Sequence, residues 1–205
     1  MVSTKKDFQP LIFNGRPLKS MNQYYNKKRS HLKSKLPKRK KSSRRLRKLN
    51  LKRNDKVNDY LHKTSKKIVD ILVDNDIRCL VIGKNDGWKQ KTNMKKENNQ
   101  NFVSIPHSRF VDMLIYKCER KGIDIRLQEE SYTSKCSFLD LEDICHHDKY
   151  VGRRVKRGLF KSSDGTFINA DVNGAYNILR KAITSVTTKG TEGFVVNPKI
   201  IMILN

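Results

Sequence analysis

Three segments of the chain have the apolar spacing of a helix. In residues 55–77 apolar side chains recur at helical spacing, which predicts an amphipathic helix that ends near Asn75. A second helix is expected to begin at Pro106 and to end at Gly122. A third is expected to begin at Asp171.

Short apolar runs with the pattern of strands separate these helices. Residues 78–85 form an apolar run closed by Gly83, residues 123–130 alternate apolar and polar side chains, and residues 166–169 form a further short run. Because strands and helices follow one another along the chain, the pattern predicts an α/β fold with a mixed or parallel sheet flanked by helices.

The preceding segment is basic and has only a thin apolar edge. Leucines between positions 32 and 49 are spaced for two helical pieces that are broken near Pro37. We predict a long basic helical hairpin over residues 18–78, with residues 37–43 as its turn. A disordered basic loop is the alternative that this pattern leaves open.

The net charge indicates the kind of partner. The 205 residues carry a formal charge of +25, with a sequence pI near 10.1 and 32% charged residues. No acidic residue lies between Asp7 and Asp55. A long run of one sign repels itself unless it meets a polyanion, and each Lys or Arg placed on a phosphate releases a condensed counterion. Nucleic acid is therefore the first partner to consider.

A membrane is not an expected partner. No apolar stretch approaches the roughly 20 residues that span a bilayer, and no signal-peptide core follows Met1. The sequence therefore predicts a soluble, cytoplasmic protein. The cysteines lie far apart in mostly apolar contexts, which fits reduced thiols better than a disulfide framework.

Candidate nucleic-acid contacts are the cations of three regions: the basic run, a polar loop after the strand at 78–85, and a second basic cluster. They are Lys27, Lys28, Arg29, Arg39, Lys40, Lys41, Arg44, Arg45, Arg47, Lys89, Arg153 and Arg154.

Candidate catalytic residues are carboxylates in the C-terminal half. Asp171 lies at the N-terminus of an expected helix, and Glu129 and Glu130 lie at the end of an expected apolar strand. Mg²⁺ takes hard oxygen ligands, so a phosphodiester-cleaving site needs carboxylates from separate strands that converge on two ions. Strand alternation puts the two glutamates on opposite sides and does not decide which side faces the site. The alternatives are a helix N-terminal carboxylate and a polar strand end.

Five segments that cover nearly the whole chain carry a resemblance. They are FNGRPLKSMNQYYNKKRS (13–30), VIGKNDGWKQ (81–90), EESYTSKCSFLD (129–140), KRGLF (156–160) and INADVNGAYNILRK (168–181), of which the last is the most specific. In this order they resemble the TnpB (OrfB) family of insertion-sequence proteins, compact RuvC-type nucleases related to type V CRISPR effectors. The resemblance implies an RNase H-like (RuvC-type) fold, an RNA-guided, Mg²⁺-dependent DNA endonuclease ancestry, and DNA and guide-type RNA as partners.

The chain departs from the family in three places. It has no Gly-Ile-Asp-x-Gly motif, which supplies the family's first catalytic aspartate from a central strand. It has Gly83 or Lys84 where many relatives carry a glutamate. A branch of the family relocates that carboxylate to the strand of Glu129 and Glu130, and we favour Glu130 as the substitute metal ligand. It also lacks the paired Cys-x-x-Cys of the family's zinc ribbon, so zinc is not expected.

These departures predict a C-terminal fragment. Residues 1–17 are expected to be a remnant strand of the RuvC-like domain, residues 18–78 the basic hairpin inserted into it, and residues 79–205 the remainder, with an irregular insert at about 134–165. The RNase H-like sheet would be incomplete at its N-terminus, and the missing part supplied in trans is a further candidate partner.

The expected function follows from this assignment. We expect a truncated TnpB-like, transposon-associated protein that binds DNA and RNA, with Asp171 and Glu130 as Mg²⁺ ligands and little or no nuclease activity of its own. A nuclease-dead repressor or RNA-binding module is the alternative.

Overall fold

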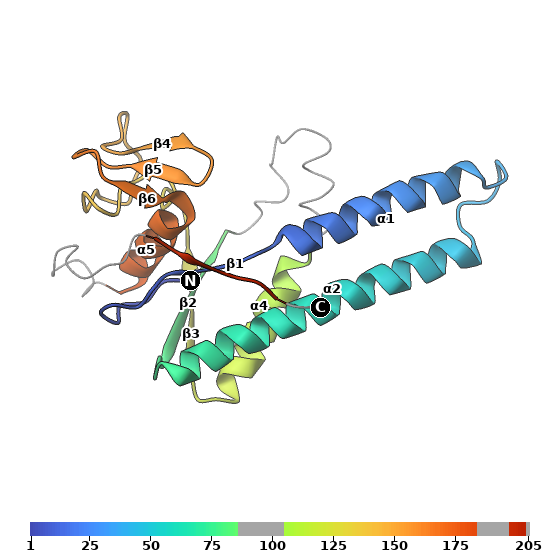
Figure 1. Cartoon of the computed structure of the whole chain (residues 1–205), viewed down its shortest axis with the longest axis horizontal. Coiled ribbons are helices and arrows are strands. Elements are labelled where there is room, and N and C mark those ends of the chain that lie inside the picture. Colours follow the sequence, from blue (N-terminus) through green and yellow to red (C-terminus); the bar gives the residue numbers. More distant parts are fainter. Residues whose placement is uncertain (86–104, 184–196, 204–205) are drawn as a thin grey trace. The chain divides into compact units, whose positions relative to one another are not determined.

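The chain forms two compact units in a computed structural model that describes residues 1–85, 105–183 and 197–203 (Figure 1). Among these residues the first unit contains 1–13, 79–85, 123–183 and 197–201, and the second contains 14–78, 105–122 and 202–203. Residues 105–122 thus belong with the helical segment 14–78, whereas the sequence pattern grouped them with the rest of 79–205.

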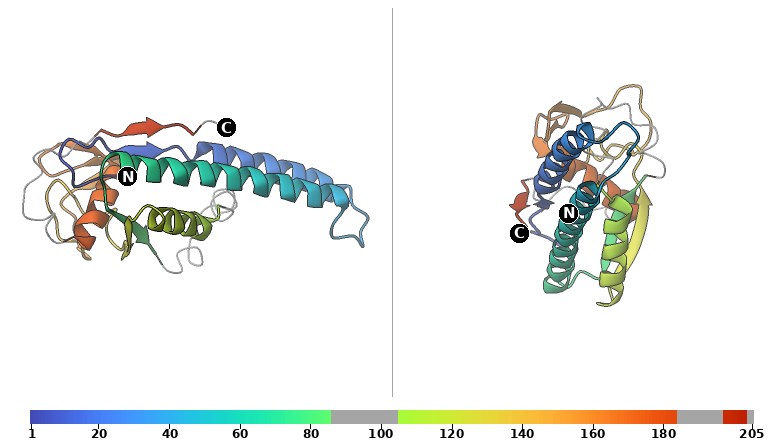
Figure 2. Two further views of the ribbon diagram at one scale, coloured as in Figure 1. Left: turned by 90° about the horizontal axis from the view of Figure 1, so that it is seen from below. Right: turned by 90° about the vertical axis from the view of Figure 1, so that its right-hand side faces the viewer.

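The described part of the second unit is built from α1 (Arg16–Ser34), α2 (Arg44–Asp74) and α4 (His107–Glu119). The Oγ atom of Ser43 caps the N-terminus of α2 by accepting a hydrogen bond from the backbone N–H of Leu46. Figure 2 shows α1 and α2 side by side. Their apolar edges meet α4 in a core of Leu18, Val57, Tyr60, Leu61 and Met113.

Polar contacts fix the pairing of these helices. The hydroxyl of Tyr25 on α1 donates to Asn50 Oδ1 on α2 at 2.6 Å, and Arg53 donates twice to the Oδ1 of the buried Asn22. Lys117 of α4 donates to Ser65 Oγ of α2 at 2.7 Å. The three helices are therefore held by directional bonds as well as by apolar contact.

The described residues of the first unit form three small sheets. Strand β1 (Leu11–Phe13) pairs in parallel with β7 (Lys199–Ile201), and β2 (Cys79–Lys84) pairs in parallel with β3 (Asp124–Glu129). Strands β4 (Arg153–Lys156), β5 (Leu159–Lys161) and β6 (Phe167–Asn169) form an antiparallel sheet. The predicted mixed α/β class is confirmed. Within the described ranges, however, no strand joins these sheets into the single sheet that was expected.

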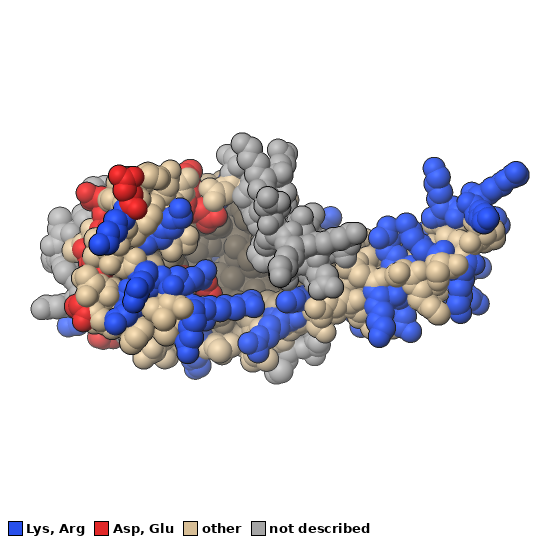
Figure 3. Space-filling model, turned by 90° about the horizontal axis from the view of Figure 1, so that it is seen from above, with Lys and Arg blue, Asp and Glu red and all other residues tan. Residues whose placement is uncertain are grey.

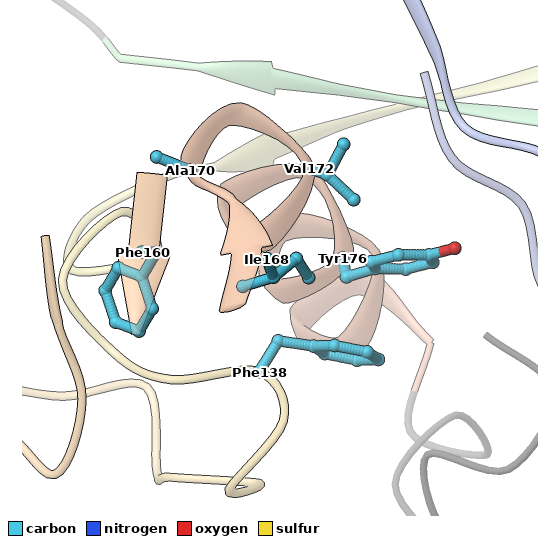
Figure 4. Close-up of a cluster of buried hydrophobic side chains, with 6 residues drawn as sticks. All are labelled: Phe138, Phe160, Ile168, Ala170, Val172 and Tyr176. Atoms are coloured by element: carbon cyan, nitrogen blue, oxygen red, sulfur yellow. The ribbon is translucent and has the colours of Figure 1, made fainter. Parts of the chain in front are cut away.

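Helix α5 (Ala170–Ala182) carries the core of this unit. Its apolar face meets strands β5 and β6 and the segment before them, and the ring of Tyr176 stacks on that of Phe138 at 4.5 Å between centroids (Figure 4). The buried cluster consists of Phe138, Phe160, Ile168, Ala170, Val172 and Tyr176. The helix carries Asp171 and also contacts β2 and β3, the strand that ends at Glu129.

Two strands lie in the segment that the sequence pattern left irregular. Residues 134–165 contain β4 and β5, and the buried carboxylate of Glu142 accepts hydrogen bonds from the backbone N–H groups of Ser137 at 2.7 Å and Val151 at 2.8 Å. All four cysteines are free thiols. Among the described helices, none combines the length and the apolar character that crossing a bilayer requires.

Candidate functional site

Asp171 lies in the first turn of α5 and is exposed. Asn169 caps this helix, and its Oδ1 accepts from the backbone N–H groups of Asp171 and Val172 at 2.9 and 3.3 Å. The Asp171 side chain is 72% exposed, and its Oδ1 lies 3.6 Å from Nη2 of Arg154 on β4. Burial lowers the pKa of the Met1 amino group to about 6, and the charge of Asp171 opposes this shift, so the two groups lie within electrostatic reach. The carboxylate is therefore available to a ligand, with Arg154 beside it.

The structure separates the two glutamates at the end of β3. Glu129 is exposed, and its Oε2 lies 2.5 Å from the ammonium group of Lys181 on α5. Hydrogen bonds from Lys181 and then from Ser131 lower the pKa of Glu129 to about 2. Glu130 is half-buried, and burial raises its pKa, with a further rise from the charge of Glu129. Glu129 is thus neutralised by a cation, whereas Glu130 is a desolvated carboxylate that a cation would stabilise.

The Glu130 carboxylate lies where a side chain at position 83 would begin. A Cβ built on Gly83 of β2 would be 2.7 Å from Glu130 Oε2 and 2.7 Å from Cδ1 of Ile178 on α5. Such distances are shorter than ordinary contacts of about 3.5 Å or more. The glycine therefore leaves the space that Glu130 enters, between β2 and α5.

A row of polar residues on α5 holds the segment that follows Glu130. Asn173, Asn177 and Arg180 are buried and lie at i, i+4 and i+7, so they share one face of the helix. Asn173 accepts from the backbone N–H of Phe138 at 2.9 Å, and Arg180 donates to the backbone carbonyl of Glu142. These three residues were not predicted from the sequence. They could have been found there as polar residues at helical spacing in an otherwise apolar segment.

The candidate nucleic-acid contacts lie mostly on the helical pair. Every described member of the set is exposed: Lys27, Lys28, Arg29, Arg39, Lys40, Lys41, Arg44, Arg45, Arg47, Arg153 and Arg154. On the face drawn in Figure 3, cations gather at the end of the helical pair with no acidic residue among them. Lys89 lies outside the described residues.

Side chains that bind metal ions do not cluster in the described part of the chain. Within residues 1–85, 105–183 and 197–203, no three or more His, Cys, Asp or Glu side chains form a group that would hold a metal ion. Cys145 Sγ lies 3.4 Å from His147 Nε2, but this ring nitrogen is also 2.8 Å from the backbone carbonyl of Asp143. Two such side chains fall short of the four ligands of a structural zinc site.

Two family models and one curated relative match this chain. A family model described as a probable transposase of the OrfB_IS605 type matches residues 1–89, and a model of the Cas12f1-like TNB domain matches residues 107–178. The CRISPR-associated endodeoxyribonuclease Cas12f2 of a Micrarchaeota archaeon (strain CG1_02_47_40) is 30% identical over 154 residues, which are 69% of this chain and 27% of that relative.

A solved structure shares the fold. The cryo-EM structure of a Cas12f1-sgRNA-target DNA complex matches with a TM-score of 0.60 at 18% identity, over 83% of this chain and 43% of that chain. The chain thus spans less than half the length of the relatives it matches. The two family models, which match residues 1–89 and 107–178, and the relative show that the chain belongs to the TnpB (OrfB) family.

Proposed function

We propose that this chain is a DNA- and RNA-binding member of its family that contributes Asp171 and Glu130 to a Mg²⁺ site acting on DNA phosphodiesters. The relative named as an endodeoxyribonuclease and the neighbour solved with guide RNA and target DNA support the choice of partners. When bound, Mg²⁺ neutralises the charge that develops on the phosphate oxygens and activates water.

The position of Glu130 is the observation that carries this proposal. The resemblance to the family implies a glutamate at the end of the strand that is β2 here, and in this chain the carboxylate of Glu130 reaches the space beside Gly83. Burial raises the pKa of Glu130 because it penalises the charged form, and a bound cation would offset that penalty. The hard carboxylate oxygens of Glu130, just after β3, and of Asp171, on α5, are donors that Mg²⁺ prefers.

Asp171 and Ile178 are seven positions apart on α5, so they lie on the same face of the helix. Ile178 and Glu130 both lie beside Gly83, so the Glu130 carboxylate reaches the helix near this face. If Mg²⁺ binds here, Glu130 and Asp171 would be the carboxylates that hold it.

The exposed cations of α1 and α2 would bind phosphates. If six of them contact a duplex, the logarithm of the affinity falls with the logarithm of the salt concentration with a slope of about −5. Replacing Arg44, Arg45 and Arg47 by Gln is expected to reduce this slope by about 3. Lys63→Gln with Lys66→Gln is the matched control on α2, because those ammonium groups already pair with Asp59 and Asp70.

Metal binding tests the site directly. Mn²⁺ stands in for Mg²⁺, and the loss of its free EPR signal measures binding to the 205-residue protein. We expect Glu130→Gln and Asp171→Asn each to weaken binding at least tenfold, with Glu129→Gln as the control because Lys181 already neutralises Glu129. Equal effects of all three changes, or none, would remove this site from the proposal.

A cleavage assay tests whether two carboxylates suffice for activity, and Mn²⁺ binding separates the two candidate functions. The 205 residues contain no Gly-Ile-Asp-x-Gly motif, so two carboxylates are expected to give little or no Mg²⁺-dependent cleavage by this polypeptide alone. Robust cleavage that Asp171→Ala abolishes would refute that expectation. The exposed cationic helices favour the second candidate, a binding module without nuclease activity. In that case DNA affinity would persist in Asp171→Ala and no Mn²⁺ would bind.

A further inference from the structure

A chain of hydrogen bonds connects the main chain of Glu130 to helix α5. The hydroxyl of Thr133 donates to the Glu130 carbonyl at 2.8 Å, and the Thr133 backbone N–H donates to the same oxygen at 3.3 Å. Nδ2 of Asn177 then donates to the Thr133 carbonyl at 3.0 Å. Thr133 and Asn177 are 3% and 0% exposed, so these bonds are shielded from water.

We propose that Asn177 and Thr133 are positioning residues that hold Glu130 in register with Asp171. The inference rests on the proposed function, because it assigns these residues to the same metal site. Asp171 and Asn177 lie on one helix, which fixes the distance between them along the helix axis. The hydrogen bonds just described, called the Thr133–Asn177 link, tie the main chain of Glu130 to this helix.

Glu130 needs such support because the strand pairing ends before it. The register of β2 and β3 runs from Cys79 opposite Asp124 to Lys84 opposite Glu129. Glu130 is the next residue, and its carbonyl is held by Thr133 where the ladder would otherwise continue. A carboxylate on an unsupported residue would move with the rotation of its backbone, and misplaced ligands lose metal affinity.

The chemistry of Asn177 favours a positioning role over simple packing. Its Nδ2 donates to two carbonyls, those of Thr133 and Cys136, at 3.0 and 2.8 Å. Among the described residues no donor reaches its buried Oδ1. An unsatisfied buried acceptor is unfavourable, so the Oδ1 atom of Asn177 lowers the stability of the fold. The Nδ2 atom of the same amide holds the segment that follows Glu130.

Asn173 provides a matched control on the same helix. It lies one turn earlier, is 0% exposed, and bonds the backbone at Phe138 and Cys136, both farther along the chain from Glu130. The substitution Asn173→Leu removes buried amide bonds of the same kind as Asn177→Leu removes. It leaves Thr133 and its bond to Glu130 unchanged.

The test compares metal affinity with stability. Mn²⁺ binding by EPR and thermal unfolding are measured on the full chain for Asn177→Leu, Thr133→Val and Asn173→Leu. We expect the first two to weaken Mn²⁺ binding about tenfold, the scale of losses when groups that orient metal ligands are removed. Asn173→Leu should stay within about twofold of the unchanged protein while losing comparable thermal stability. Thr133→Val keeps the test decisive if Asn177→Leu does not fold.

Amide hydrogen exchange gives a readout that needs no metal. Exchange at Ser131, Tyr132 and Thr133 should quicken at least tenfold in Asn177→Leu and stay unchanged in Asn173→Leu. Equal effects of the two helix variants on metal affinity and on exchange would overturn the inference. If the unchanged protein binds no Mn²⁺, the proposed function fails, and the exchange rates alone then support or overturn the Thr133–Asn177 link.

Discussion

Adding one methyl group at position 83 tests the packing that places Glu130. The Cβ of Gly83→Ala would lie 2.7 Å from Glu130 Oε2 and 2.7 Å from Ile178 Cδ1. Carbon contacts are ordinarily about 3.5–4.0 Å, so each neighbour must move by roughly 1 Å. Overpacking of this kind costs about 1–3 kcal/mol, and replacing a strand glycine returns about 0.5–1 kcal/mol.

Both neighbouring atoms end flexible side chains and can move at small cost, so the overpacking should lie at the low end of that range. The expected net loss of stability is then about 0–0.5 kcal/mol, a fall of up to roughly 2 °C in Tm for a chain of this size. Thermal unfolding by circular dichroism measures it, and Mn²⁺ binding shows whether the Glu130 carboxylate has moved. Adding Ile178→Val removes Cδ1 and leaves Cγ1 at an ordinary 3.5 Å. The double variant should recover part of the lost stability.

Gly174→Ala is the matched control in the same unit. Its Cβ would lie 3.9 Å from the nearest atoms, Ser134 Cα and Thr133 O, and an alanine inside α5 should stabilise the helix by up to about 1 kcal/mol. If Gly83→Ala is as stable as Gly174→Ala and binds Mn²⁺ unchanged, Glu130 does not occupy the space beside β2.

Three further changes test other parts of the structure. Lys181→Met should raise the pKa of Glu129 from about 2 toward its ordinary 4.5. A lowered carboxylate pKa contributes stability above about pH 4.5 that is lost as the pH falls toward 2, so the stability of the variant should depend less on acid pH. An NMR titration of Glu129 that does not shift in the variant would contradict the ion pair. Ser43→Ala should remove the cap of α2 at a cost of about 0.5–2 kcal/mol in thermal unfolding, and Ser42→Ala, one residue outside the cap, should cost nothing measurable. Phe138→Ala should cost about 3–5 kcal/mol and abolish the near-ultraviolet signal of Tyr176, whose ring it stacks on; a loss below about 1 kcal/mol would contradict the described core.

Local apolar patterns predicted individual elements well. The expected strands at 78–85, 123–130 and 166–169 are β2, β3 and β6, and the helices expected after Pro106 and at Asp171 are α4 and α5. Strand β4 was missed because all of its residues, Arg153–Lys156, are exposed, so it shows no alternation between apolar and polar positions. The pairing of β1 with β7 and of β2 with β3 was not predictable, because each of these pairs joins segments far apart in the chain.

The candidate site was predictable as a set of residue types but not as an arrangement. Glu129 and Glu130 are adjacent, and their roles separate only because Lys181, 52 positions away, reaches the first of them. The partners of Asn173 and Asn177 are backbone carbonyls and amides of a segment about 40 positions earlier. No local pattern specifies which main-chain group a buried amide will meet.

The close approach of Gly83 and Glu130 constrains how this chain can change over evolutionary time. A glutamate at position 83 would need the volume that the end of the Glu130 side chain fills, so the Glu130 carboxylate would have to move to make room for it. The effect of a change at either position therefore depends on the residue at the other, which makes the pair epistatic.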